Sequence, residues 1–302
     1  MVCAIKRFTP RNAIQSRNLA CIFQREREIL QKLSTWRHLH IVDFIGSFEV
    51  QSESKFGHFD LILPYAEGGN LYEFLRLPRP PEWLFTGPGC RPFCDALFVQ
   101  AKGIVDALAF LHAKSSNAGY LIHCDIKPSN ILILNGTFKL ADFGSSRIKA
   151  SEETSKTEWA MGTPMYEPPE KTIEDSDTHG RARDVWALGC VLLEILVLLI
   201  YGFREPAAVD LFEDERMNST TKGVRAFSRT MGSVDVWIVS LGKLIEDHHQ
   251  RNQERWVDGD WEEEQKMMRT LLAVIRGMLD LNRVKRIESS RASECLHLMK
   301  LI

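Results

Sequence analysis

A short stretch of the sequence gathers side chains that could handle a phosphoryl group. Residues 122–132 read IHCDIKPSNIL and contain Asp125, Lys127 and Asn130, and Asp142 opens a DFG triplet twelve residues after Asn130. Phosphoryl transfer needs a carboxylate that orients the attacking hydroxyl, oxygen ligands for Mg²⁺ and a cation beside the transferred phosphate. A lone DFG recurs by chance, whereas HxDxKPxN at this distance from it is specific. The spacing therefore predicts a phosphoryl-transfer site.

This pattern resembles the eukaryotic protein kinase family, and the resemblance covers most of the chain. The lysine two residues after the first aspartate, in DIKPSN, is typical of the serine/threonine type. The resemblance implies that Asp125 is the catalytic base and that Lys127 is the cation near the γ-phosphate of ATP. It also implies that Asn130 and Asp142 are the Mg²⁺ ligands. The acceptor would be a serine or threonine hydroxyl of a protein substrate.

The first residues of the chain resemble another kinase motif. Val-Cys-Ala-Ile-Lys at residues 2–6 is similar to the VAIK strand, which implies that Lys6 holds the α- and β-phosphates of ATP. Its partner would be Glu26, on a helix that we predict over about residues 19–33. Glu26 is preferred to Glu28 because the apolar residues that follow then keep the family's spacing. The alternative is that Glu26 lies on the solvated face of a charged run.

The resemblance also locates the adenine site. Ala4 and Leu132 would flank the adenine ring, and Leu63 falls at the position called the gatekeeper. Residues 64–66, which include Tyr65 and Ala66, would form the hinge whose backbone meets the adenine edge. ATP and Mg²⁺ are thus the expected cofactors.

The elements that must position these residues follow from hydrophobic periodicity. We predict short strands at residues 1–8, 41–49, 59–63, 121–122 and 131–140, and helices at 96–112 and from 184 onward. The expected fold class is α+β, a two-lobed kinase-like fold with a small β-rich lobe and a mainly helical large lobe. A single domain would span residues 1–302, with residues 1–65 forming a partial small lobe from its third strand and residues 66–302 the large lobe.

Further downstream, the resemblance implies a salt bridge between Glu170 and Arg286 and a helix that begins near Asp184. Cys124 stands where most regulated kinases have an arginine that binds a phosphorylated activation segment. We expect Cys124 to be a small buried side chain rather than a reactive thiol. Activity should then not require phosphorylation of the candidate residues in that segment, which are Ser151, Thr154, Ser155 and Thr157.

The family's glycine-rich loop lies on the two strands before the VAIK lysine, yet only five residues precede Lys6 and they contain no GxGxxG. We therefore expect a truncated small lobe without the backbone amides that cover the ATP phosphates. Three explanations stay open, namely a truncated start, a pseudokinase and a kinase with a minimal lid, and the intact set of site residues favours the first. The alternative function is a catalytically impaired binding scaffold that uses residues 78–92 and 210–261 as partner surfaces.

The composition of the chain indicates which classes of binding partner and which cellular compartment to expect. The chain carries 38 Lys and Arg against 40 Asp and Glu, so its net charge of −2 argues against a general nucleic-acid binder. Seven cysteines without a CxxC pair, and no signal peptide, predict a cytoplasmic or nuclear protein with reduced thiols. The apolar run at residues 186–203 contains Glu194 and is interpreted as a core helix rather than a membrane span. The oligomeric state stays open.

Overall fold

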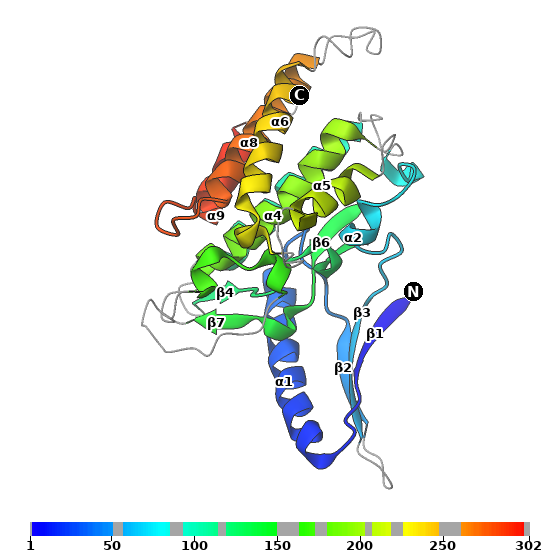
Figure 1. Ribbon diagram of the computed structural model, residues 1–302. Coiled ribbons are helices and arrows are strands. Elements are labelled where there is room, and N and C mark those ends of the chain that lie inside the picture. Colours follow the sequence, from blue (N-terminus) through cyan, green and yellow to red (C-terminus); the bar gives the residue numbers. More distant parts are fainter. Residues whose placement is uncertain are drawn as a thin grey trace.

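The computed structural model describes residues 2–50, 57–84, 93–113, 119–149, 163–172, 180–202, 207–218, 226–247 and 261–298. A small sheet and one long helix, α1 (Ala13–Trp36), lie at one end of the molecule, and the other end is mainly helical (Figure 1). The chain therefore has the α+β class expected for a kinase-like fold.

The small sheet is antiparallel, with the strand order β1-β3-β2. Its strands are β1 (Cys3–Phe8), β2 (Gly46–Val50) and β3 (His58–Pro64). Alternate residues of β1 are half-buried and exposed, which places Ala4, Lys6 and Phe8 on one face. Phe23 of α1 packs against this face, with ring centroids 6.0 Å from Phe8 and 5.0 Å from Phe59. These contacts hold the helix against the strand that carries Lys6.

Helix α1 is longer than the sequence predicted. It begins at Ala13 because the side chain of Asn12 accepts a hydrogen bond of 2.9 Å from the backbone N–H of Gln15, which is an N-cap contact. The predicted strand at residues 41–49 is also shorter and starts at Gly46. The backbone before it leaves the sheet, and Val42 N–H donates instead to the carbonyl of Leu140 at 2.9 Å.

The mainly helical part carries two small β-ribbons. The helices are α2 (Leu71–Phe74), α3 (Phe93–His112), α4 (Arg181–Tyr201), α5 (Ala207–Asn218), α6 (Met231–Glu246), α8 (Trp261–Met278) and α9 (Ser289–His297). The ribbons pair β4 (Tyr120–Ile122) with β7 (Arg147–Lys149), and β5 (Ile131–Leu134) with β6 (Thr137–Leu140). One strand was expected over residues 131–140, but Asn135 and Gly136 have positive φ angles of 47° and 72° and turn the chain into a hairpin.

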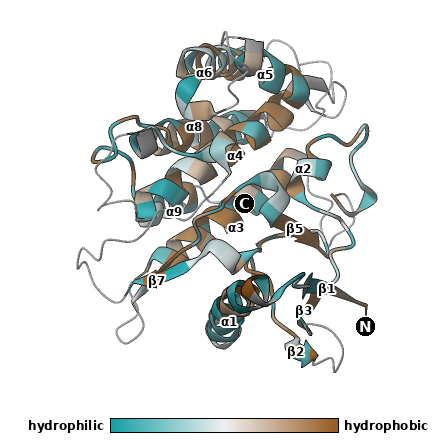
Figure 2. Cartoon of the chain, turned by 60° about the horizontal axis from the view of Figure 1, so that its bottom comes forward, coloured by the Kyte–Doolittle hydropathy of each residue, from teal (hydrophilic) through white to brown (hydrophobic). Residues whose placement is uncertain are grey.

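Helix α4 forms the centre of the core, as the apolar run predicted. It is long and apolar enough to cross a membrane, but 89% of its most apolar window is buried inside the protein. Figure 2 shows that hydrophobic residues also gather in α3 and β5, whereas α1 is largely hydrophilic. The described part of the chain therefore buries its apolar run in its own core.

Some expectations fall on residues outside the described ranges. They are the phosphorylation candidates Ser151, Thr154, Ser155 and Thr157, residues 85–92 of the proposed partner loop, and parts of residues 210–261.

Candidate active site

Three charged side chains from distant parts of the chain meet at one point. Lys6 Nζ lies 2.8 Å from both carboxylate oxygens of Glu26 and 2.6 Å from Asp142 Oδ1. β1 contributes Lys6, α1 contributes Glu26, and the turn after β6 contributes Asp142. The expected pairing of Lys6 with Glu26 rather than Glu28 is thus present in the structure.

The local backbone explains the glycine of the DFG triplet. Asp142 has a left-handed backbone with φ 64°, and a short 3₁₀ turn follows at Phe143–Ser145. A Cβ atom on Gly144 would lie 3.1 Å from Glu26 Oε2 and 3.4 Å from Asp142 Oδ1. Glycine therefore lets this turn approach the lysine and its two carboxylates closely.

Burial and charge act in opposite directions on the three groups. Burial lowers the pKa of Lys6, but Glu26 and Asp142 outweigh burial and raise the pKa above its ordinary value. Burial raises the pKa of Asp142, and Lys6 outweighs it, so this pKa is lowered. For Glu26, which is 1% exposed, burial dominates and the pKa is raised despite Lys6. Lys6 is consequently a fixed cation facing a partly exposed carboxylate.

Asp125 lies in the loop after β4, and three other residues hold its carboxylate. Its Oδ1 accepts hydrogen bonds of 2.9 Å from the backbone N–H and the hydroxyl of Thr163. Its Oδ2 lies 2.9 Å from Lys127 Nζ and accepts from Asn130 Nδ2 at 3.0 Å. Burial raises the pKa of Asp125, but Lys127 and Thr163 outweigh burial and lower it. The group is therefore an oriented carboxylate rather than a strong base.

Asn130 and Asp142 suit a hard divalent cation. The Nδ2 atom of Asn130 donates to the backbone carbonyl of Asp125 at 2.8 Å as well as to its carboxylate. The carbonyl oxygen of Asp125 can only accept a hydrogen bond, so the amide of Asn130 must present its Nδ2 to this carbonyl. The Oδ1 atom of Asn130 is therefore left for a cation. The described residues contain no cluster of three or more His, Cys, Asp and Glu side chains that could hold a metal. Mg²⁺ does not require one, because it binds through one or two carboxylates together with substrate phosphates and water.

A buried aspartate holds the backbone of the same loop. Asp184 in the first turn of α4 accepts hydrogen bonds from the backbone N–H groups of His123 at 2.7 Å and Cys124 at 2.9 Å. Cys124 has a left-handed backbone with φ 68° and is 6% exposed. Burial raises the pKa of its thiol to about 12, so it is a buried side chain and not a reactive thiol, as expected.

The residues expected around adenine lie where two segments meet. Ala4 and Leu63 are register partners in the β1–β3 pair. β3 ends at Pro64, and Tyr65 and Ala66 lead into a turn in which Gly68 N–H donates to the Ile133 carbonyl at 3.1 Å. A Cβ on Gly68 would lie 2.6 Å from a methyl group of Ile133, so only glycine allows this approach. The contact brings the segment after the hinge beside β5, which contains Leu132.

Comparison with known proteins agrees with this geometry. The family model of the protein kinase domain matches residues 1–298. The chain belongs to the protein kinase family. Within it, the chain groups with the serine/threonine protein kinases, because the similar curated proteins carry that name or the names of protein kinase kinase kinases.

Three relatives illustrate the similarity. The serine/threonine-protein kinase RUNKEL of Arabidopsis thaliana is 35% identical over 174 residues, which cover 56% of this chain. Mitogen-activated protein kinase kinase kinase A of Dictyostelium discoideum is 33% identical over 180 residues, or 59% of this chain. Mitogen-activated protein kinase kinase kinase 1 of Arabidopsis thaliana is 33% identical over 189 residues, or 62% of this chain. The chain spans 11%, 16% and 27%, respectively, of the length of these relatives.

The stretch of chain that follows Thr163 is anchored in the core. The guanidinium of Arg286, whose side chain is fully buried, donates to both carboxylate oxygens of Glu170 at 2.7 and 3.0 Å, which confirms the predicted salt bridge. Tyr166 donates its hydroxyl to the buried carboxylate of Glu194 at 3.1 Å. Both contacts tie the polypeptide beside Asp125 to α4 and to the residues just before α9.

Two functional contacts escaped the sequence reasoning. Thr163 was not expected to contribute to the site, yet its hydroxyl donates to Asp125 and accepts from Lys127 Nζ at 2.8 Å. His112 was assigned only to a helix, yet its Nε2 lies 3.1 Å from Asp184 Oδ2. The one signal for His112 is its position at the end of α3, directly after the apolar run at residues 107–111.

Proposed function

We propose that this chain transfers the γ-phosphoryl group of ATP to a serine or threonine hydroxyl of a protein. The observation that carries the proposal is the joint geometry of the two clusters. Lys6 contacts Glu26 and Asp142, while Asp125 is oriented by Lys127, Asn130 and Thr163. A chain that served only as a scaffold would not need both clusters. The proposed arrangement is one kinase domain, with residues 1–65 in the small lobe and 66–302 in the large lobe.

Asp125 would act on the acceptor hydroxyl. The hydroxyl oxygen forms a bond to the γ-phosphorus, the bond from that phosphorus to the β–γ bridging oxygen breaks, and ADP leaves with the bond electrons. The hydroxyl proton passes to the Asp125 carboxylate. Because the pKa of this carboxyl is below its ordinary value, Asp125 orients the hydroxyl and accepts the proton late, once the forming bond to phosphorus has made the hydroxyl more acidic.

Two cations and one metal site would neutralise the phosphates. Lys6 would hold the α- and β-phosphates, and Lys127 would contact the γ-phosphate from the acceptor side. Asn130 Oδ1 and the Asp142 carboxylate would hold Mg²⁺, which would neutralise phosphate oxygens during the transfer. Ala4, Leu63, Tyr65, Ala66 and Leu132 would enclose adenine. The cytoplasm or nucleus is the proposed compartment, because all the cysteines that the structure describes are free thiols.

The test compares Asp125→Asn and Asp142→Asn with the surface control Asp235→Asn, using ATP, Mg²⁺ and a protein substrate. We expect kcat to fall at least about a hundredfold in the two site variants, since each loses a charge used in the reaction. The control should keep wild-type kcat, and thermal unfolding should show that all the variants fold. Site variants as active as the control would refute the proposal.

A further inference from the structure

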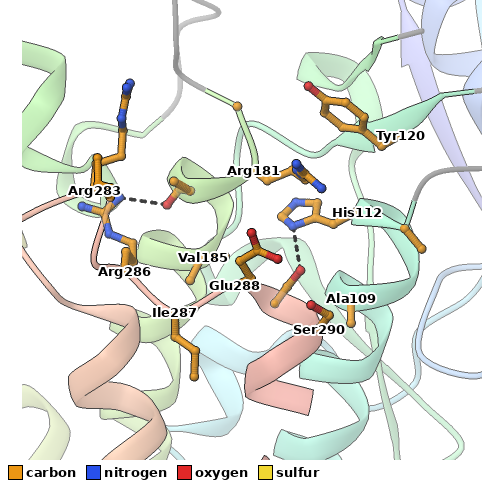
Figure 3. A pocket seen from close by; sticks show the side chains of 15 residues that line it. Ala109, His112, Tyr120, Arg181, Val185, Arg283, Arg286, Ile287, Glu288 and Ser290 are labelled. Atoms are coloured by element: carbon orange, nitrogen blue, oxygen red, sulfur yellow. Dashed lines mark hydrogen bonds between the residues drawn. The ribbon is translucent and has the colours of Figure 1, made fainter. Parts of the chain in front are cut away.

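A hollow lies on the helical part of the molecule, apart from the candidate active site. It has a volume of about 510 Å³ and lies between the end of α3, the start of α4 and the segment that leads into α9 (Figure 3). None of its lining residues belongs to the Lys6 cluster or to the loop that carries Asp125. The volume is within the range of pockets that bind small molecules.

The lining combines apolar surface with charged side chains. Ala109, Val185 and Ile287 supply apolar walls. Three arginines line the cavity, of which Arg286 is paired with Glu170 and Arg283 also has an interaction partner. Among the lining residues that the structure describes, Glu288 is the one carboxylate. A ligand that fits this lining has an apolar body and a single negative charge, because Glu288 would repel a second one.

Arg181 is the cation best placed to receive that charge. It is exposed at the first position of α4, and its guanidinium lies 4.8 Å from the centroid of the Tyr120 ring. Among the described residues it has no carboxylate partner. The N-terminus of α4 lies at the same place, where Gly180 provides no side-chain cap and Asp184 in the first turn offsets part of the positive potential of the helix. Figure 3 shows Arg181, Tyr120 and His112 on the same side of the cavity.

The cavity wall is also connected to the catalytic loop. His112 lines the cavity, and its Nδ1 lies 3.0 Å from the hydroxyl of Ser289, another lining residue. Its Nε2 contacts the Asp184 carboxylate that holds the backbone N–H groups of His123 and Cys124. A ligand that contacts this imidazole therefore acts two hydrogen bonds away from the residue preceding Asp125.

We propose that this cavity binds a small organic monocarboxylic acid with an apolar body, and that its occupancy changes the stability of the catalytic loop through His112 and Asp184. The ligand carboxylate contacts Arg181, and its apolar body packs on Ala109, Val185 and Ile287. The regulatory meaning of this site rests on the proposed kinase function, but the binding and the loop response do not.

The binding test uses 3-(trifluoromethyl)benzoate as the probe, observed by ¹⁹F NMR, with the neutral 3-(trifluoromethyl)benzamide as its matched control. We expect the benzoate to bind the wild-type chain more tightly than the amide. Arg181→Gln should weaken benzoate binding about threefold to fivefold, the effect of losing one exposed charge contact. Arg17→Gln, which removes an exposed arginine on α1, should leave binding unchanged.

The loop response is read by amide hydrogen exchange. The benzoate should change the exchange rates of the His123 and Cys124 amides at least about twofold in the wild-type chain and less in Arg181→Gln. Equal binding of benzoate and amide, no binding, equal binding in both arginine variants, or unchanged exchange at residues 123 and 124 would each overturn the proposal. Neither readout uses phosphate transfer, so an inactive enzyme would refute the proposed function and leave this test intact.

Discussion

Replacement of Asp184 by asparagine should destabilise the fold and the catalytic loop together. The carboxylate is 1% exposed and accepts hydrogen bonds from two backbone N–H groups, and it also contacts His112 Nε2. An asparagine has one acceptor oxygen, and its NH₂ group would face a donor in either orientation. One buried donor would lose its partner, and the charge that strengthens the other bonds would also be lost. Together these losses amount to about 3–5 kcal/mol.

The loss should reach the chemistry through Cys124. Its left-handed backbone is unfavourable for a residue with a side chain, by about 1–2 kcal/mol, and the bond to Asp184 is what opposes its relaxation. Once this bond is lost, Asp125, the next residue, should leave its position beside Thr163. We therefore expect kcat to fall in Asp184→Asn even at temperatures where the variant is folded.

Urea unfolding gives the stability change, and steady-state phosphorylation of a protein substrate at a temperature below the unfolding transition gives kcat. Asp235→Asn is the matched control, because Asp235 is exposed on α6. An Asp184→Asn chain that loses less than about 1 kcal/mol, the cost of an ordinary hydrogen bond, would refute this account of the loop. So would a destabilised chain with wild-type kcat.

Three further predictions concern single residues. Burial raises the pKa of Glu194 to about 7, so the folded protein keeps a proton on this residue at pH values where the unfolded chain has lost it. The free energy of unfolding should therefore fall by about 2 kcal/mol from pH 5 to pH 8. Urea titrations of Glu194→Gln should lack this fall. Iodoacetamide at pH 8 should modify the exposed Cys3 and spare Cys124, whose thiol has a pKa of about 12; peptide mass spectrometry that finds both modified equally would contradict its burial. Gly144→Ala should displace the Glu26 carboxylate, which its Cβ would approach to 3.1 Å, and raise the KM for ATP at least about threefold, whereas an unchanged KM would show that the turn can yield.

The residues with a fixed linear spacing were the predictable part of the site. Asp125, Lys127 and Asn130 lie within six positions, so their order along the chain already brings them together. Lys6 and Glu26 were paired through the family resemblance, since nothing local requires a contact between a strand and a helix 20 residues apart. The kinase-like fold class also followed from the resemblance, while periodicity gave the individual strands and helices.

Contacts that depend on tertiary packing were not predictable. Thr163 meets Asp125 across 38 positions, and His112 meets Asp184 across 72. No periodicity encodes such distances. The hairpin at residues 131–140 is a different case. Asn135-Gly136 is a strong turn signal, but we predicted a single strand across it.

The central claim is that this chain moves phosphate onto protein hydroxyl groups. The most direct test incubates the 302-residue chain with γ-labelled ATP, Mg²⁺ and a mixture of protein substrates, followed by phosphoamino acid analysis of the labelled protein. We predict label on phosphoserine or phosphothreonine that is lost in Asp125→Asn. No label from a chain that binds Mg²⁺ and ATP, or equal label from the variant, would contradict the claim.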